Sequence, residues 1–406
     1  MKEGVKWPYI PYDEYRLRID RAKQLLQKHE MDAMLLFSPF NWWYYAGWAE
    51  DQTRHASFWR SALIILPGRD PIAVAHPAYR ACLSLTTYIE DVRYWHEFAR
   101  RLPTSFWALL YDSLAGLGLT NKVLGIETGH GIDTFLSFDE LDILKKGLPD
   151  AKIVSADKVI WEQRMIKTPY EVEVLREAGR RGCAAVRAAF EAIKPGVNEL
   201  EVHRVFWETA VRNGLLEGPL RQTQWLCWTS NPKEAGGIHR WICQAVDRII
   251  EVGDQGICDG GPTYRGYRTD FQRSFYVGDP PQKQLSYSGM AKEAFFHTLA
   301  VIKPGIRICD IYEAGVKNIQ KMDPSQRVNI IDFLGHSIGL MRHEPPWIRA
   351  KEETVVQPGM VLCVEMGVFD RAGEVVGAMP EDMLLVTEHG FENLTRHMSQ
   401  DLWIAK

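Results

Sequence analysis

The sequence predicts an α/β domain at the N-terminus, followed by a larger α+β domain that contains an internal repeat. Three observations lead to this prediction. A chain of 406 residues is too long for one ordinary hydrophobic core, so two domains are the expected arrangement. Helical and strand patterns alternate through the N-terminal part of the chain, and one helix–turn–helix pattern occurs twice in the remainder.

The N-terminal part alternates between the two periodicities. Residues 12–31 carry apolar side chains at helical spacing, and the apolar run 32–38 that follows is typical of a buried strand. Residues 61–75 and 122–128 add further strands, with helical stretches between them. This alternation predicts an α/β domain.

A long amphipathic helix marks the change to the second domain. Its pattern lies within residues 159–193, and Thr168 and Pro169 supply a cap and a first turn. We therefore place the boundary at about residue 158, which gives domains of residues 1–158 and 159–406.

The second domain contains two similar segments, residues 192–211 and 301–319. Each has an Ile-Lys-Pro-Gly turn between two helical patterns. Pro cannot continue a helix and Gly accepts positive φ, so the turn ends the first helix of each pair. We interpret the segments as parts of a duplicated unit of two helices plus strands. The region where the two halves meet is a candidate site.

Composition excludes several classes of function. The net charge of −4 and the lack of a Lys/Arg-rich block argue against a nucleic-acid partner. The N-terminus has no apolar signal core, and Ser38 and Pro39 interrupt the most apolar stretch, so no membrane segment is expected. Seven scattered cysteines without a CxxC pair indicate reduced thiols, and we predict a cytoplasmic protein.

Two aspartates flank a turn-like stretch within residues 257–271, among apolar neighbours. Buried carboxylates are costly unless they are paired or bind a metal. In a symmetric hairpin centred between Tyr264 and Arg265, Asp259 and Asp270 would lie directly opposite each other, with Cβ atoms about 4.5–5.5 Å apart. Without a cation, one would have to stay protonated. Tyr-Arg is not a favoured two-residue turn, so a bulge or longer loop would shift this register.

Three further side chains suit the same chemistry. His336 lies in a Gly-rich approach, Glu365 in an apolar strand, and Glu381 at the start of another apolar run. Two Asp, one His and two Glu suit divalent first-row metals. They are enough to hold two ions that activate a water molecule.

These motifs resemble the superfamily of methionine aminopeptidase, prolidase and creatinase, whose catalytic domain has the pita-bread fold. The resemblance covers nearly the whole chain. It rests on both Ile-Lys-Pro-Gly turns and on residues 164–178, 266–278, 335–346, 357–369 and 381–395. It implies a creatinase/prolidase-type α/β N-terminal domain and an α+β pita-bread catalytic domain with an internal pseudo-twofold repeat.

The resemblance also implies roles for single residues. The family's five metal ligands carry over onto Asp259, Asp270, His336, Glu365 and Glu381. They would hold two divalent ions of Mn, Fe, Co or Zn. Glu365 would also shuttle a proton. His343 would face the substrate and, with the less closely matching His239, stabilise a developing oxyanion or leaving nitrogen. A homodimer in which N-terminal residues reach the partner's site is expected as well.

Three departures from the family bear on the substrate. Met379 replaces an Arg that is usual in proline-specific members, Phe333 and Asp332 stand where many have another His, and Gln272 replaces a Thr or Ser. We predict a dinuclear hydrolase of an amide or C–N bond in a small-molecule or short-peptide substrate. The alternatives are a Xaa-Pro dipeptidase or aminopeptidase and a metal-dependent lyase on a small zwitterion such as dimethylsulfoniopropionate. The Asp-Gly-Gly at the first ligand counts against that lyase. Five retained ligands count against a non-catalytic binding protein.

The N-terminal domain offers a candidate substrate contact. In creatinase this domain supplies a Phe-x-Arg to a small substrate's carboxylate, and the motif maps onto Phe58 and Arg60. The alternative is that Arg60 forms a surface ion pair. The aromatic run 42–48 favours a core or dimer interface over a ligand cage.

Overall fold

The structure is a computed structural model that describes residues 5–48, 59–95, 105–132, 134–216, 226–231, 245–324, 328–370 and 377–406. The chain forms two compact units, and the division falls between Arg164 and Met165. This point lies in the last turn of helix α6 (Asp157–Met165). The boundary of about residue 158 expected from the sequence lies at the start of the same helix.

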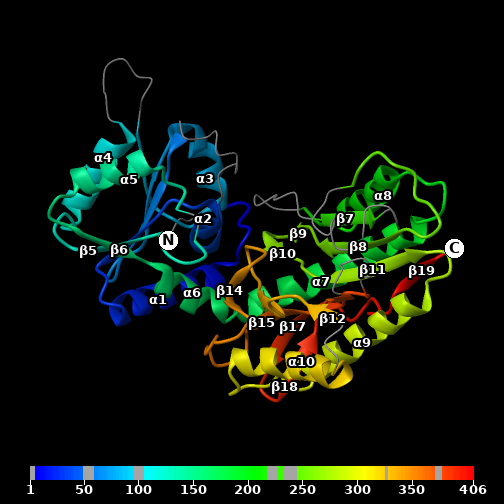
Figure 1. The fold of residues 1–406 in the computed structure, drawn as a ribbon. Helices are drawn as coiled ribbons and strands as arrows, with labels where there is room; N and C mark the ends of the chain where they lie inside the picture. Colours follow the sequence, from blue (N-terminus) through cyan, green and yellow to red (C-terminus); the bar gives the residue numbers. More distant parts are fainter. Residues whose placement is uncertain are drawn as a thin grey trace. The chain divides into compact units, whose positions relative to one another are not determined.

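The N-terminal unit is built on a six-stranded sheet with the order β4-β3-β2-β1-β5-β6 (Figure 1). Three pairings are parallel and two are antiparallel. The strands are β1 (Ala33–Leu36), β2 (Ala62–Ile65), β3 (Ile72–Ala75), β4 (Asp91–Tyr94), β5 (Val123–Ile126) and β6 (Lys152–Ser155). The helices are α1 (Tyr12–Lys28), α2 (Pro39–Ala46), η2 (Pro77–Tyr79), α3 (Arg80–Thr86), α4 (Phe106–Gly116), α5 (Phe138–Gly147) and α6.

The four central strands are the ones that the sequence predicts. Strands β1, β2 and β3 are fully buried, as their continuous apolar runs require. The edge strands β4 and β6 are mostly half-buried and carry charged residues. Their sequences therefore lack the apolar run that identifies a strand.

The aromatic run forms helix α2, which begins after the Ser38 cap. Its side chains are buried, and two of their polar ends have hydrogen-bond partners within the same unit. The Trp42 indole donates to the Leu36 carbonyl at 3.1 Å, and the Tyr45 hydroxyl donates to the Gln163 side-chain oxygen at 3.0 Å. The run therefore belongs to the core of the N-terminal unit.

The second unit opens with helix α7 (Pro169–Ala192), which begins as the sequence predicts. The Thr168 side chain accepts from the Glu171 amide, and the Glu171 carboxylate accepts from the Thr168 amide. This reciprocal capping box satisfies two donors that a helix start would otherwise leave unpaired. Figure 1 shows α7 alongside the strands β9, β10 and β19 of the same unit.

The predicted repeat is confirmed by its main-chain hydrogen bonds. Helices α7 and α8 (Glu199–Arg212) pack as one pair, and α9 (Gln282–Leu299) and α10 (Ile308–Met322) as another. Gly196 and Gly305 end the two turns with φ of +87° and +90°. Their amides make matching bonds, from Gly196 to the Ile250 carbonyl at 2.8 Å and from Gly305 to the Val356 carbonyl at 2.9 Å.

The strands of the second unit form two larger sheets, with the orders β19-β11-β8-β7 and β14-β13-β15-β17-β18. Two short pairs, β9–β10 and β12–β16, complete the set. The bounds are β7 (Leu226–Asn231), β8 (Gln255–Gly260), β9 (Thr263–Tyr264), β10 (Tyr267–Arg268), β11 (Gln272–Val277), β12 (Val328–Ile330), β13 (Gly335–Ser337), β14 (Glu344–Trp347), β15 (Val361–Glu365), β16 (Val368–Asp370), β17 (Glu381–Thr387), β18 (Gly390–Asn393) and β19 (Trp403–Ala405).

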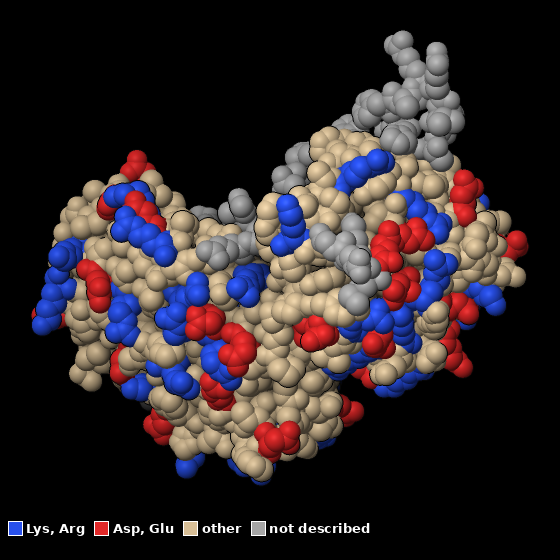
Figure 2. All heavy atoms as spheres, turned by 180° about the vertical axis from the view of Figure 1, so that it is seen from behind, with Lys and Arg blue, Asp and Glu red and all other residues tan. Residues whose placement is uncertain are grey.

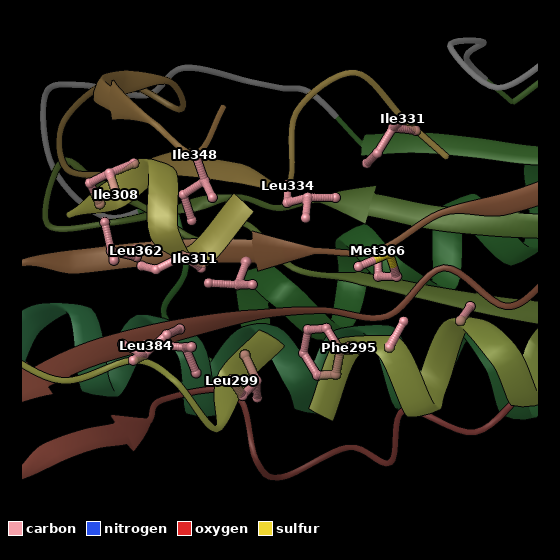
Figure 3. Close-up of a cluster of buried hydrophobic side chains, with 14 of the residues drawn as sticks. Phe295, Leu299, Ile308, Ile311, Ile331, Leu334, Ile348, Leu362, Met366 and Leu384 are labelled. Atoms are coloured by element: carbon pink, nitrogen blue, oxygen red, sulfur yellow. The ribbon is translucent and has the colours of Figure 1, made fainter. Parts of the chain in front are cut away.

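A hydrophobic core fills the space between the second helix pair and the five-stranded sheet (Figure 3). Phe295 and Leu299 of α9 belong to the same buried cluster as Leu362 of β15 and Leu384 of β17. Because side chains alternate along a strand, the neighbours of Leu362 and Leu384 point to the opposite face of the sheet. That face carries the residues described below.

The surface shown in Figure 2 mixes both signs of charge, with Lys and Arg side chains next to Asp and Glu. Over the part of the chain that the structure describes, no helix is long and apolar enough to cross a membrane. Five cysteines of the described part of the chain are free thiols: Cys82, Cys183, Cys258, Cys309 and Cys363.

Candidate metal centre

Four buried side chains bring potential metal ligands together on the strand face opposite the core. The ligand atoms of Asp270, His336, Cys363 and Glu381 all lie within 4.8 Å of one another. Asp270 precedes β11, and the other three belong to β13, β15 and β17. The cluster thus joins the two sheets of the second unit.

His336 is oriented toward the carboxylates of this cluster. Its Nε2 lies 3.6 Å from Asp270 Oδ2 and 3.9 Å from Glu381 Oε1. Its Nδ1 lies 3.0 Å from the Ser337 carbonyl oxygen, which can only accept, so Nδ1 carries the proton. Burial lowers the pKa of His336 to about 4. The imidazole is therefore neutral at pH 7, with its Nε2 lone pair facing the carboxylates, as in a metal-ligating histidine.

Strand β15 presents Glu365 to the same face as Cys363. Leu362 and Val364 lie in the hydrophobic core, so the alternating residues Cys363 and Glu365 point away from it. Glu365 is the direct cross-strand neighbour of Glu381, and Cys363 is that of His336.

The predicted register of the first hairpin is wrong. Asp259 pairs with Gln272 rather than with Asp270, because the hairpin turns one residue later than expected. The turn residues are Arg265 and Gly266, which have φ of +47° and +84°. Two positive φ angles match a two-residue hairpin turn with Gly in second place, which Tyr-Arg would not satisfy. Asp270 becomes a diagonal neighbour of Asp259, and the two still interact electrostatically.

In the observed register, Asp259 faces Gln272 across β8 and β11. In the other half of the unit, Glu365 faces Glu381 across β15 and β17. Gln272 is buried, and its side-chain nitrogen has no hydrogen-bond partner among the residues that the structure describes.

The acidic residues are held in surroundings that disfavour their charge. Burial, followed by the charge of Asp259, raises the pKa of Asp270 well above its ordinary range. Burial is also the main cause of the raised pKa values of Asp259, Glu365 and Glu381. Like charges this close need a cation or a proton.

Asp270 supplies a specific sign that a cation belongs here. Its Oδ1 is buried and accepts no hydrogen bond from any described residue. A buried carboxylate oxygen without a partner is expensive, whereas metal coordination satisfies it. Buried oxygen donors and one neutral imidazole suit a divalent first-row ion, so the residues fit the predicted metal.

A buried ion pair holds the main chain at Glu381 in place. Arg273 donates to the Glu381 carbonyl at 2.6 Å and pairs with Asp382 at 2.7 Å, with both charged side chains almost fully buried. Asp382 also accepts from Asn393 and Thr395, each at 2.8 Å. This network fixes the start of β17, from which Glu381 projects.

His343, which the family resemblance implies to face the substrate, lies beside the cluster. Its ring centre is 4.3 Å from that of His336 and 4.8 Å from that of Trp347. Burial lowers its pKa, helped by His336, so His343 is also neutral at pH 7. The positive charges of Arg342 and Arg268 act on Asp270 as well.

Cys363, Arg342 and Arg268 are absent from the predicted site. Each lies within a motif that marks the site, so position in the motif is the signal that could have revealed them. Cys363 precedes Glu365 by two residues on a strand, a spacing that predicts a shared face.

The substrate-binding roles expected from the sequence remain predictions. Phe58 and His239 lie outside the described residues. Arg60 forms a two-point ion pair with Glu140 and also donates to the Phe135 carbonyl. Met379, at the position of the family's Arg, is buried in the core, where it cannot bind a charged group.

Comparison with known proteins agrees with this fold. Residues 18–166 match the creatinase/prolidase N-terminal domain, and residues 173–388 match metallopeptidase family M24. A Xaa-Pro dipeptidase of Pyrococcus horikoshii is 27% identical over 387 residues, covering 93% of this chain and 97% of that protein. A creatinase of a Bacillus species is 26% identical over 406 residues, covering 97% and 93%. The crystal structure of the Pyrococcus horikoshii prolidase superposes with a TM-score of 0.75 at 23% identity, covering 94% and 98%.

Fold and site together define a two-domain protein with a pita-bread catalytic domain. The chain belongs to metallopeptidase family M24, whose match spans more than half of it. It is a metal-dependent hydrolase of the prolidase and creatinase superfamily, as the sequence predicts.

Proposed function

We propose that this hydrolase cleaves the amide bond of small peptides of the Xaa-Pro type at a dinuclear metal centre. The observation that carries the proposal is the buried cluster of Asp270, His336 and Glu381, whose carboxylates need a cation. Two observations support adding Asp259 and Glu365 to this site: the charge of Asp259 acts on Glu365 and Glu381, and Glu365 is the cross-strand neighbour of Glu381. These five side chains would hold two divalent ions. The relatives named Xaa-Pro dipeptidase support the choice of substrate.

The residues of this chain would divide the chemistry between them. Bound divalent ions would supply water activation and polarisation of the scissile carbonyl. Glu365 would take a proton at its carboxylate and return it to the leaving nitrogen. His343, which is neutral and close to His336, would offer a hydrogen bond to the developing oxyanion or to the leaving nitrogen.

A second candidate function is creatinase-like hydrolysis of a C–N bond in a small non-peptide carboxylate. The observation that favours it is Met379, which is buried where proline-specific members usually carry Arg. A creatinase of similar length also matches nearly the whole chain.

One panel of substrates separates the two candidates. The metal-loaded full chain should be offered Xaa-Pro dipeptides, matched Xaa-Ala dipeptides, and guanidino and betaine carboxylates. Preference for Xaa-Pro dipeptides supports the first proposal, and turnover of the non-peptides alone replaces it with the second. Asp270→Asn should abolish either activity. Asp370→Asn is the matched control, because Asp370 is a buried aspartate of the same unit that pairs with Lys283 at 2.7 Å.

The homodimer and the cytoplasmic location remain predictions. Sedimentation of the full chain at micromolar concentration tests the first, and a monomer would contradict it.

A further inference from the structure

We propose that the sulfur of Cys363 is a ligand of one metal ion, together with Asp270, His336 and Glu381, and that it biases the centre toward zinc over manganese. The inference rests on the metal centre of the proposed function and deepens it. It adds a ligand outside the five that the family resemblance implies.

The position of Cys363 supports this role. Its side chain is completely buried and leaves β15 on the same face as Glu365, directly across the ladder from His336. Its Sγ lies 3.5 Å from the Asp270 main-chain oxygen, so the thiol is directed toward Asp270. Its sulfur and the ligand atoms of the other three residues all lie within 4.8 Å of one another.

A second observation points to a ligand at this place. Asp270 is almost fully buried, and its Oδ1 has no hydrogen-bond partner in the described part of the chain. The sulfur and the oxygen of a tetrahedral zinc site are about 3.5 Å apart, so a sulfur–oxygen pair at the 4.8 Å limit of this cluster would close by about 1.3 Å on binding. Side-chain rotation of this size is compatible with ligands on separate strands.

The chemistry of the donor set determines the metal preference. Manganese and magnesium favour carboxylate and water oxygens, whereas a thiolate favours zinc and other softer ions. On binding, the S–H bond of Cys363 breaks, the sulfur–metal bond forms, and the proton leaves to the buffer. The hydrogen bond from the thiol to the Asp270 main-chain oxygen is lost in the same step.

Cobalt substitution tests the sulfur bond without relying on activity. The metal-stripped, reduced full chain is titrated with Co²⁺, and the near-ultraviolet absorption from sulfur-to-cobalt charge transfer is recorded. We expect this band in the native protein and in Cys183→Ser, and its loss in Cys363→Ser. Cys183 is a matched control, because it is a buried thiol of the same unit that donates to the Thr395 carbonyl at 3.3 Å. Cobalt bound per chain is measured by elemental analysis in each protein.

Metal competition tests the preference. We expect the Zn²⁺-over-Mn²⁺ affinity ratio to fall by about tenfold or more in Cys363→Ser and to stay unchanged in Cys183→Ser. Cys363→Thr provides a second substitution if the serine protein does not fold. Cobalt binding without the band, or a band that survives in Cys363→Ser, overturns this inference and leaves the proposed function standing. Failure to bind cobalt, zinc or manganese overturns both.

Discussion

The guanidinium of Arg60 is held by Glu140 in a two-point ion pair, and both side chains are largely buried. From the sequence, Arg60 had two possible partners: the carboxylate of a substrate, or an acidic side chain in a surface ion pair. A role in substrate binding therefore remains a prediction, and it requires the pair with Glu140 to open.

Substitution of either partner separates the two roles. If Arg60 binds a substrate carboxylate, Arg60→Ala should lower kcat/KM by roughly ten- to a hundredfold, because a charge-assisted two-point contact is lost. Arg60→Lys should restore little, since an ammonium does not reproduce the planar fork. Glu140→Gln should keep kcat/KM or raise it. The pair would be purely structural if Arg60→Ala left kcat/KM unchanged and if Arg60→Ala and Glu140→Gln lost the same amount of thermal stability.

Glu127 is a second residue whose charge is controlled by its surroundings. It accepts hydrogen bonds from the amides of Phe37 and Ser38 and from the Asn41 side chain. Burial nevertheless raises its pKa from 4.5 to about 7. Because the folded-state pKa lies above the unfolded one, protonation stabilises the fold. This contribution is complete below about pH 4.5 and is lost as the pH rises through 7.

The stability difference between the native chain and Glu127→Gln should therefore change with pH. Between pH 4.5 and 8, the native chain should lose about 3 kcal/mol relative to the variant, which cannot ionise. Denaturant unfolding of both full-length proteins at the two pH values measures this change. A stability difference that stays constant with pH would show that the pKa of Glu127 is the same in the folded and unfolded chain, and a native chain that gains stability relative to the variant would show that the pKa is lowered by folding.

At the site, sequence reasoning works best where a residue type limits the chemistry. Carboxylates in apolar strands have few uses, so Glu365 and Glu381 could be singled out, and the structure places them side by side. The register of the first hairpin was missed because it depends on the backbone conformation of Arg265 and Gly266. Cys363 was missed because a buried cysteine usually serves as a small hydrophobic side chain.

At the scale of elements, the two Ile-Lys-Pro-Gly turns occupy the same place in the two helix pairs of the duplicated unit. Both glycines have φ near +90°, and a Cβ added at either would meet no atom within 4 Å. Substitution should thus strain the backbone without causing a clash. The sequence motif predicted both turns, because Pro and Gly act locally. The half-buried edge strands β4 and β6 form because they pair with neighbouring strands of the sheet. Their sequences contain no local motif that predicts a strand.

Matched alanine substitutions test the equivalence of the two halves. Gly196→Ala and Gly305→Ala should each destabilise the protein by about 1–2 kcal/mol, because a residue with a Cβ rarely adopts positive φ. Gly289→Ala, in the open middle of α9, should instead stabilise it by about 0.5–1 kcal/mol. Denaturant unfolding measures all three. A large cost at one turn and none at the other would contradict equivalent roles.

At the scale of the whole molecule, each unit has its own sheet and core. All five ligands proposed from the family order belong to the second unit, on strands or at their ends. Metal binding should therefore depend on the second unit. Residues of the N-terminal unit, such as Arg60, would affect the choice of substrate instead.

The most direct test of the central claim measures metal content and peptide hydrolysis in the same samples. The full chain is stripped of metal, reloaded with one divalent first-row ion at a time, and assayed on Xaa-Pro dipeptides. We predict that hydrolysis disappears with the metal, returns in proportion to the metal bound, and stays absent in Asp270→Asn, which should bind less metal. Undiminished hydrolysis by the metal-free chain, or full metal binding by Asp270→Asn, would contradict the account.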